Sequence, residues 1–133
     1  MRAYPIRQDL VNATLPIDEV SITVPPSHPD DYRLIKASVE SEPLEYPPVV
    51  VAVTHGDWRK FINLQSVFLK PDESIPDETA GYFVTCGNNR VRALKELGYT
   101  EVDVLMVESF SAGSGYCKEM RKWFNAKQGK RNR

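Results

Sequence analysis

The sequence predicts one small α/β domain in which helices flank a mixed sheet. Its length of 133 residues, with 41% hydrophobic and 26% charged residues, is typical of a single soluble globular domain. Continuous β-branched runs such as Val49 to Val53 indicate strands that are covered on both faces. Segments with apolar residues at helical spacing lie between these runs, so strands and helices alternate along the chain.

The first half of the chain is predicted to contain two strands and one helix. From Val20 to Val24, apolar and hydroxyl-bearing side chains alternate with the period of a half-buried strand, which two prolines end. A helix is expected from Pro29 to Glu42, because proline suits a first helical turn and the two aspartates that follow complement the helix dipole. Val49 to Thr54 is predicted to be a central strand that ends at His55-Gly56-Asp57.

The pattern after this strand is less uniform. Trp58 to Lys70 fits a helix face, while its end fits a strand equally well, so both interpretations stay open. Pro71 to Ala80 is polar, acidic and rich in turn residues, which predicts a surface loop.

A strand, a tight turn, a helix and a further strand are predicted next. Gly81 to Cys86 indicates another buried strand, which Gly87 ends. From Asn88 to Leu97 apolar residues recur at helical spacing, and Gly98 stands where a helix is expected to stop. Glu101 to Glu108 alternates again and is predicted to be a third strand of the same sheet.

Charge is unevenly distributed along the chain. The net charge is −1, so the whole chain lacks the basic composition typical of nucleic-acid-binding proteins. The end is basic, with a short helix expected from Tyr116 to Lys127, and this tail either binds phosphate backbones or is a solvated terminus. We expect an N-terminal segment over 1–14, the domain over 15–110, and a flexible break with the basic tail over 111–133. The basic residues of the tail are Lys118, Arg121, Lys122, Lys127, Lys130, Arg131 and Arg133.

Cysteine content and the N-terminal composition indicate the compartment. The two cysteines, Cys86 and Cys117, are not spaced as metal ligands, and a reducing cytoplasm is the simplest setting for them. The first fifteen residues contain charges and no apolar stretch of the kind that a signal peptide or membrane span requires. We therefore predict a cytoplasmic protein without a membrane partner, and both monomer and dimer stay open.

The tight turn between the strand and the helix is the main candidate for chemistry. A helix start presents backbone N–H groups and the positive end of a dipole, which together attract phosphate. Gly87 permits a sharp turn and a close approach of ligand, the two asparagines after it can cap the helix or bond phosphate oxygens, and the arginines offer guanidinium donors. A capped helix start without a ligand is the alternative. The predicted phosphate-binding residues are Gly87, Asn88, Asn89, Arg90 and Arg92.

The block from Tyr82 to Gly98, with the strand Val102 to Val107 after it, resembles the N-terminal domain of ParB-type chromosome-partition proteins. In that family a strand leads into Gly-Glu-Arg-Arg-x-Arg-Ala, and the following helix ends in Leu-x-Gly. The resemblance covers roughly Leu15 to Glu108. It implies the fold that ParB domains share with sulfiredoxins. The residues that match the pattern are Gly87, Arg90, Arg92, Ala93, Leu97 and Gly98.

The resemblance implies binding of the phosphates of CTP or ATP, with Mg²⁺, at this helix start. Asn88 and Asn89 depart from the family, because they stand where it has a Glu-Arg pair. Asn88 also occupies the position of the catalytic cysteine of sulfiredoxins, so sulfinic-acid reductase activity is not expected. Cys86 is then interpreted as a small buried residue. A further departure is Glu119-Met120-Arg121, which replaces the family's Glu-Asn-x-x-Arg box.

These observations favour a stand-alone ParB-like nucleotide-binding domain, encoded by a phage or mobile element, that senses its ligand or hydrolyses it weakly. A ParB-like nuclease acting on DNA is one alternative, and it requires metal-binding carboxylates beside Arg90. Asp30, Asp31 and Asp57 are the candidates for that role, although surface carboxylates commonly only complement a helix dipole. A non-catalytic adaptor, whose basic tail binds DNA or a protein, is the other alternative.

Overall fold

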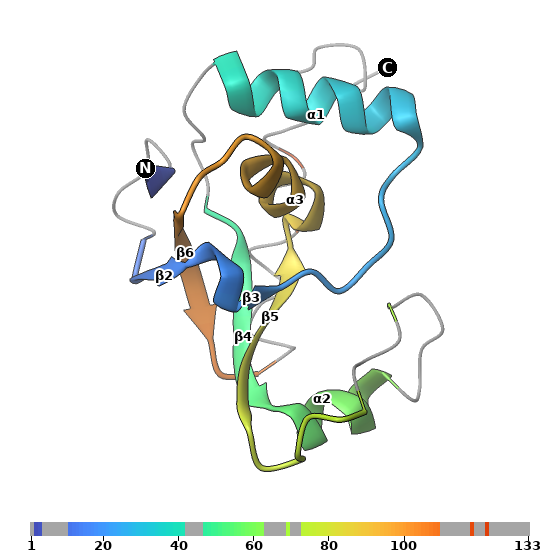
Figure 1. Ribbon diagram of the computed structural model, residues 1–133, viewed down its shortest axis with the longest axis vertical. Helices are drawn as coiled ribbons and strands as arrows, with labels where there is room; N and C mark the ends of the chain where they lie inside the picture. Colours follow the sequence, from blue (N-terminus) through green and yellow to red (C-terminus); the bar gives the residue numbers. More distant parts are fainter. Residues whose placement is uncertain are drawn as a thin grey trace.

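The computed structural model describes residues 2–3, 11–41, 47–62, 69, 73–109, 118 and 122. It confirms the mixed α/β architecture, with helices around one mixed sheet (Figure 1). The helices are α1 (Pro29–Ser41), α2 (His55–Ile62) and α3 (Asn88–Glu96), and a short 3-10 helix spans Ile17–Glu19. The strands are β1 (Arg2–Ala3), β2 (Ala13–Pro16), β3 (Val20–Ser21), β4 (Val49–Thr54), β5 (Ala80–Cys86) and β6 (Glu101–Val107).

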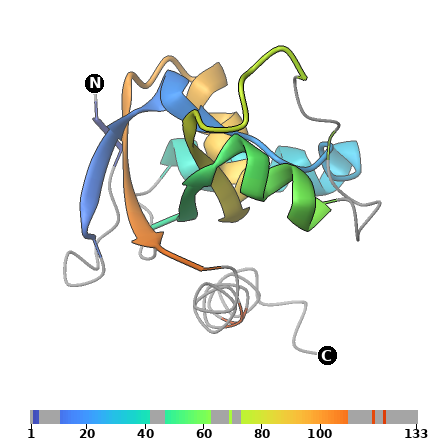
Figure 2. The ribbon, with the colours of Figure 1, turned by 90° about the horizontal axis from the view of Figure 1, so that it is seen from below.

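The sheet is six-stranded and runs in the order β1-β6-β4-β5-β3, while β2 pairs with β6 off this path. Strand β4 is antiparallel to β5 and parallel to β6, and β3 is parallel to β5. Strands β2 and β6 lie side by side at one edge of the molecule (Figure 2). Because β4 and β5 run in opposite directions, the helices that follow them, α2 and α3, begin at opposite ends of the sheet (Figure 1).

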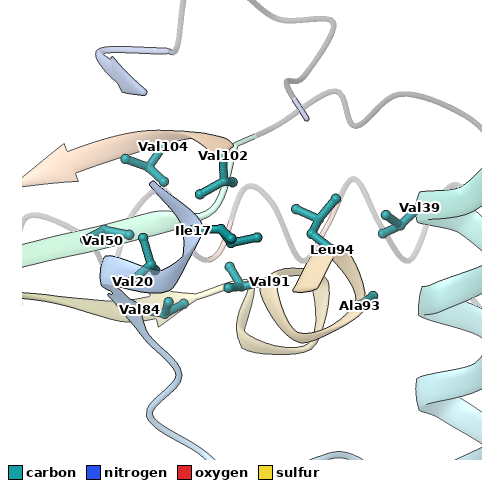
Figure 3. Close-up of a cluster of buried hydrophobic side chains, with 10 residues drawn as sticks. All are labelled: Ile17, Val20, Val39, Val50, Val84, Val91, Ala93, Leu94, Val102 and Val104. Carbon is teal, nitrogen blue, oxygen red and sulfur yellow. The ribbon is translucent and has the colours of Figure 1, made fainter. Parts of the chain in front are cut away.

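Both faces of the sheet are covered by apolar side chains. In β4, Val50 packs in one buried cluster and its neighbours Val49 and Val51 pack in the other, as expected when successive side chains point to opposite faces. Helices α1 and α3 contribute to the first cluster, and α2 contributes Trp58 to the second. Figure 3 shows the first cluster, whose members are Ile17, Val20, Val39, Val50, Val84, Val91, Ala93, Leu94, Val102 and Val104.

Most of the predicted elements are confirmed, and one prediction needs correction. The strand expected from Val20 to Val24 ends at Ser21, because the backbone ladder with β5 stops there; the N–H of Thr23 then donates to the Asn88 side chain, and its hydroxyl donates to the carbonyl of Val84 in β5. The strand before His55-Gly56-Asp57 ends at Thr54 as predicted, and these three residues also form the first turn of α2, which assigns the start of the open segment after them to a helix. The described helices are all too short or too polar to span a bilayer.

Candidate phosphate-binding site

Gly87 is the N-cap of α3 and has a left-handed backbone, with φ of 96° and ψ of 23°. Non-glycine residues rarely adopt this conformation, because their Cβ is then too close to the backbone. A Cβ on Gly87 would also lie 2.7 Å from Nη2 of Arg90 and 3.2 Å from Cβ of Pro48. Glycine is therefore required here on two grounds, and the Arg90 guanidinium lies directly against the turn.

The first turn of α3 carries positive charge without a carboxylate. Gly87 has no side chain that could cap the helix, and no acidic residue stands in the first turn. Arg90 lies in that turn and is only 5% exposed. A cation near a helix N-terminus opposes the dipole, at a cost of about 0.3–1 kcal/mol even at the surface. An anion bound at this position would interact favourably with the helix dipole.

The side chain of Asn88 is directed into the fold. It is buried, and its Oδ1 accepts a hydrogen bond of 2.7 Å from the backbone N–H of Thr23. The Thr23 hydroxyl donates to the carbonyl of Val84 at 2.6 Å. These bonds replace the ladder that β3 no longer makes with β5 after Ser21. The carbonyl oxygen of Asn88 thus fixes the start of α3 against Thr23, in the segment that follows β3.

Asn89 and Arg92 contact each other and residues 23–27, which we call the strap. Nη1 of Arg92 donates to Oδ1 of Asn89 at 2.7 Å, and Nη2 donates to the carbonyl of Val24 at 2.7 Å. Nδ2 of Asn89 donates to the hydroxyl of Ser27. The structure therefore brings these two predicted site residues together on one side of the helix start, where the strap orients both.

Sequence reasoning did not identify Thr23, Ser27 or Lys95 as parts of this region. Lys95 donates from Nζ to the carbonyl of Val20 at 3.0 Å, and burial, together with nearby Arg92, lowers its pKa against the opposing effect of Asp18. A threonine in an alternating pattern is normally taken as solvent-facing, so its burial leaves no local signal. Arg92 and Lys95 are three residues apart and therefore share one face of α3, and this spacing was the available sign that another segment of the chain lies along that face.

The far end of α3 is joined to α1. The hydroxyl of Tyr32 donates to Oε1 of Glu96 at 2.7 Å, and Nζ of Lys36 lies 3.1 Å from the same oxygen. Burial and the hydrogen bond to Glu96 raise the pKa of Tyr32 to about 12. The Tyr32 and Lys36 contacts lower the pKa of Glu96. These contacts hold α3 at the end opposite to the turn.

The carboxylates considered for a nuclease are divided between α2 and the start of α1. Asp57 lies in α2, which begins at the opposite end of the sheet. Asp30 and Asp31 stand in the first turn of α1, and Asp30 is exposed and pairs with Arg33 at 3.4 Å. Within the ranges that the structure describes, no three acidic, histidine or cysteine side chains are grouped as a metal site.

Two further predictions concern residues outside the turn itself. Cys86 is the last residue of β5 and is half-buried, packing against the second apolar cluster, so it is less enclosed than the sequence suggested. Of the basic tail, only Lys118 and Lys122 are described, and both are helical and exposed. The expected helix from Tyr116 to Lys127 otherwise lies outside the described residues.

Comparison of the chain with protein-family models, with curated proteins and with solved structures found no match.

Proposed function

We propose that the turn at Gly87 binds the phosphates of a nucleotide, CTP or ATP. The observation that carries this proposal is the combination of a glycine N-cap, a first turn without a carboxylate, and a buried arginine against the turn. Backbone N–H groups of a helix start point at a bound anion, and its dipole favours negative charge. The guanidinium of Arg90 adds charge-assisted donors of a geometry that suits phosphate oxygens.

We also propose that the domain is of the ParB and sulfiredoxin type. In its support, Gly87 forms the turn after β5, and Arg90, Arg92 and Ala93 follow it in α3, in the order in which that family uses its matching residues. The helix also stops at Gly98, whose φ is +88°. A further strand, β6, follows and pairs in parallel with β4.

Binding, rather than turnover, is the proposed activity. Mg²⁺ normally keeps several water ligands and is held by one or two carboxylates together with the substrate phosphates. Because the first turn of α3 has no acidic residue, a Mg²⁺ ion at this site would be held by the nucleotide and water. The chain's own contribution would then be to bind and orient the phosphates through Arg90, Arg92 and the helix N–H groups.

Titration calorimetry with CTP, ATP and GTP, each with and without Mg²⁺, tests the proposal. We expect Arg90→Lys to keep a charge but lose the forked geometry, and to weaken binding about tenfold or more, as for other hydrogen bonds to charged groups. Arg33→Ala is the matched control, because Arg33 is an exposed arginine of α1 whose described partner is Asp30. Failure of the wild-type chain to bind any of the three nucleotides would refute the proposal.

A further inference from the structure

The strap, residues 23–27, is attached to the start of α3 by side chains instead of a strand ladder. Ladder pairing of β3 with β5 ends at Ser21. Beyond it, Asn88 accepts from the N–H of Thr23, Arg92 donates to the carbonyl of Val24, and Asn89 donates to the hydroxyl of Ser27. All three attachments are thus made by residues of the predicted phosphate-binding set.

Two of these residues retain donors for a ligand. A guanidinium has five N–H donors, and within the described part of the chain Arg92 uses two of them, toward Asn89 and Val24. The amide of Asn89 has two hydrogens, and one is directed to Ser27. Both side chains therefore keep N–H donors that an anion could accept from while they hold the strap. They have also already lost much of the rotamer freedom that binding would otherwise remove.

We propose that the strap and a bound phosphate stabilise each other. The strap holds Arg92 and Asn89 in place for the anion, and an anion held by these side chains fixes the strap more firmly against α3. This inference rests on the proposed function, because it concerns regulation of the same site. Coupling of this kind is reciprocal, so any factor by which the strap strengthens ligand binding is also the factor by which the ligand stabilises the attached strap.

Ser27 is the positioning residue in this arrangement. Its hydroxyl accepts from Asn89, whose Oδ1 in turn accepts from Arg92, so the three groups form one chain of hydrogen bonds. Since Ser27 leads through His28 into α1 at Pro29, we expect a change at the strap to affect the start of that helix. Binding of a ligand at the turn would therefore change the stability of the strap and of the first turn of α1.

Hydrogen exchange of the strap amides, measured with and without inorganic triphosphate, tests the coupling. In the wild-type chain we expect triphosphate to slow the exchange of the amides of Val24 and Ser27. Ser27→Ala is expected to bind triphosphate up to about fivefold more weakly, the limit reached when one whole ordinary hydrogen bond is coupled to binding, and to lose this added protection. Ser27→Thr keeps the hydroxyl and restores both. Ser41→Ala is the control, because that hydroxyl bonds within α1 to the carbonyl of Ser38.

The outcomes separate the inference from the proposed function. If triphosphate binds but strap exchange is unchanged or faster, or if Ser27→Ala binds as tightly as wild type, the coupling is wrong and the phosphate site stands. A thermal midpoint that falls in Ser27→Ala in step with its affinity would assign Ser27 a purely structural role. Arg92→Lys, which cannot bridge Asn89 and Val24, must also lose the added protection. Absence of binding by the wild-type chain to triphosphate and to every nucleotide overturns both proposals.

Discussion

Replacing Gly87 by alanine tests the geometry of the turn most directly. The left-handed backbone, with φ of 96°, costs a residue with a Cβ roughly 1–2 kcal/mol. The new Cβ would lie 2.7 Å from the Arg90 guanidinium, and relieving such overpacking costs about 1–3 kcal/mol more. The free energy of unfolding should therefore fall by about 2–5 kcal/mol. With an unfolding entropy of about 2.1 cal/mol/K for each residue, the melting temperature should fall by roughly 7–18 °C.

Gly98→Ala is the matched control for this substitution. Gly98 is also left-handed, with φ of +88°, but a Cβ there would meet nothing within 4 Å. It should therefore lose only the backbone contribution, about 1–2 kcal/mol, in the same calorimetric melting experiment. Arg90→Ala removes the contact. Relative to a chain that carries Arg90→Ala alone, adding Gly87→Ala should therefore cost about as much as Gly98→Ala costs in the wild-type chain. A Gly87→Ala chain that melts no lower than Gly98→Ala would show that the Arg90 guanidinium moves aside at little cost, and would refute the packing contribution.

Three further predictions concern the packing of α3, each measured by urea unfolding. Tyr32→Phe should lower the free energy of unfolding by about 0.5–1 kcal/mol at pH 7. Because the pKa of Tyr32 is raised from 10.0 to about 12, the stabilisation by its hydroxyl is fully present below pH 10 and is lost as the pH rises toward 12. The free energies of unfolding of the wild-type and Tyr32→Phe chains should converge there. Thr23→Val removes a buried donor to the carbonyl of Val84 and should cost about 1–3 kcal/mol, with Thr23→Ser closer to wild type. Leu94→Ala, at a residue 1% exposed, should cost about 2–5 kcal/mol. Unchanged urea midpoints, or Tyr32 curves that stay parallel to alkaline pH, would contradict these contacts.

The central part of the fold could be predicted because its signals are local. An uninterrupted β-branched run such as Val49 to Val53 suits a strand that is covered on both faces, and β4 is such a strand. Likewise, a change from strand to helical spacing across Gly87, with a second glycine at Gly98, predicts the β5–α3 unit and its stop. Here each element is decided by its own residues and by the sterics of glycine.

The errors arise where contacts from distant residues decide the structure. The alternation from Val20 continues past Ser21, but Thr23 bonds to Asn88 and Val84, which lie more than sixty residues away. At His55 only a strand end was predicted, yet a helix begins there, and its first N–H groups are satisfied by the carbonyls of Thr79 and Asp77 at 2.8 and 2.9 Å. Neither set of partners leaves a trace in the local pattern.

The same distinction applies to the candidate site. The helix-start glycine and the position of the arginines follow from the sequence, and these are the features on which the phosphate proposal depends. The directions of the Asn88 and Asn89 side chains could not be predicted. Each amide is oriented by the strap, which belongs to the connection between β3 and α1 and is distant in sequence. Only the folded arrangement distinguishes backbone donors from side-chain donors at such a turn.

The opposite directions of β4 and β5 have a practical consequence for protein engineering. The described residues Glu73 to Thr79, in the connection after α2, lie beside that helix at the end of the sheet away from Gly87 (Figure 1). Within it, Asp77 and Thr79 hold the start of α2, and Arg59 donates to the carbonyl of Ile75, so that stretch must stay intact. Glu73 and Ser74 precede these anchors in an exposed turn. A fluorophore or an immobilisation tag inserted between Glu73 and Ser74 would label or attach the domain without obstructing the Gly87 turn.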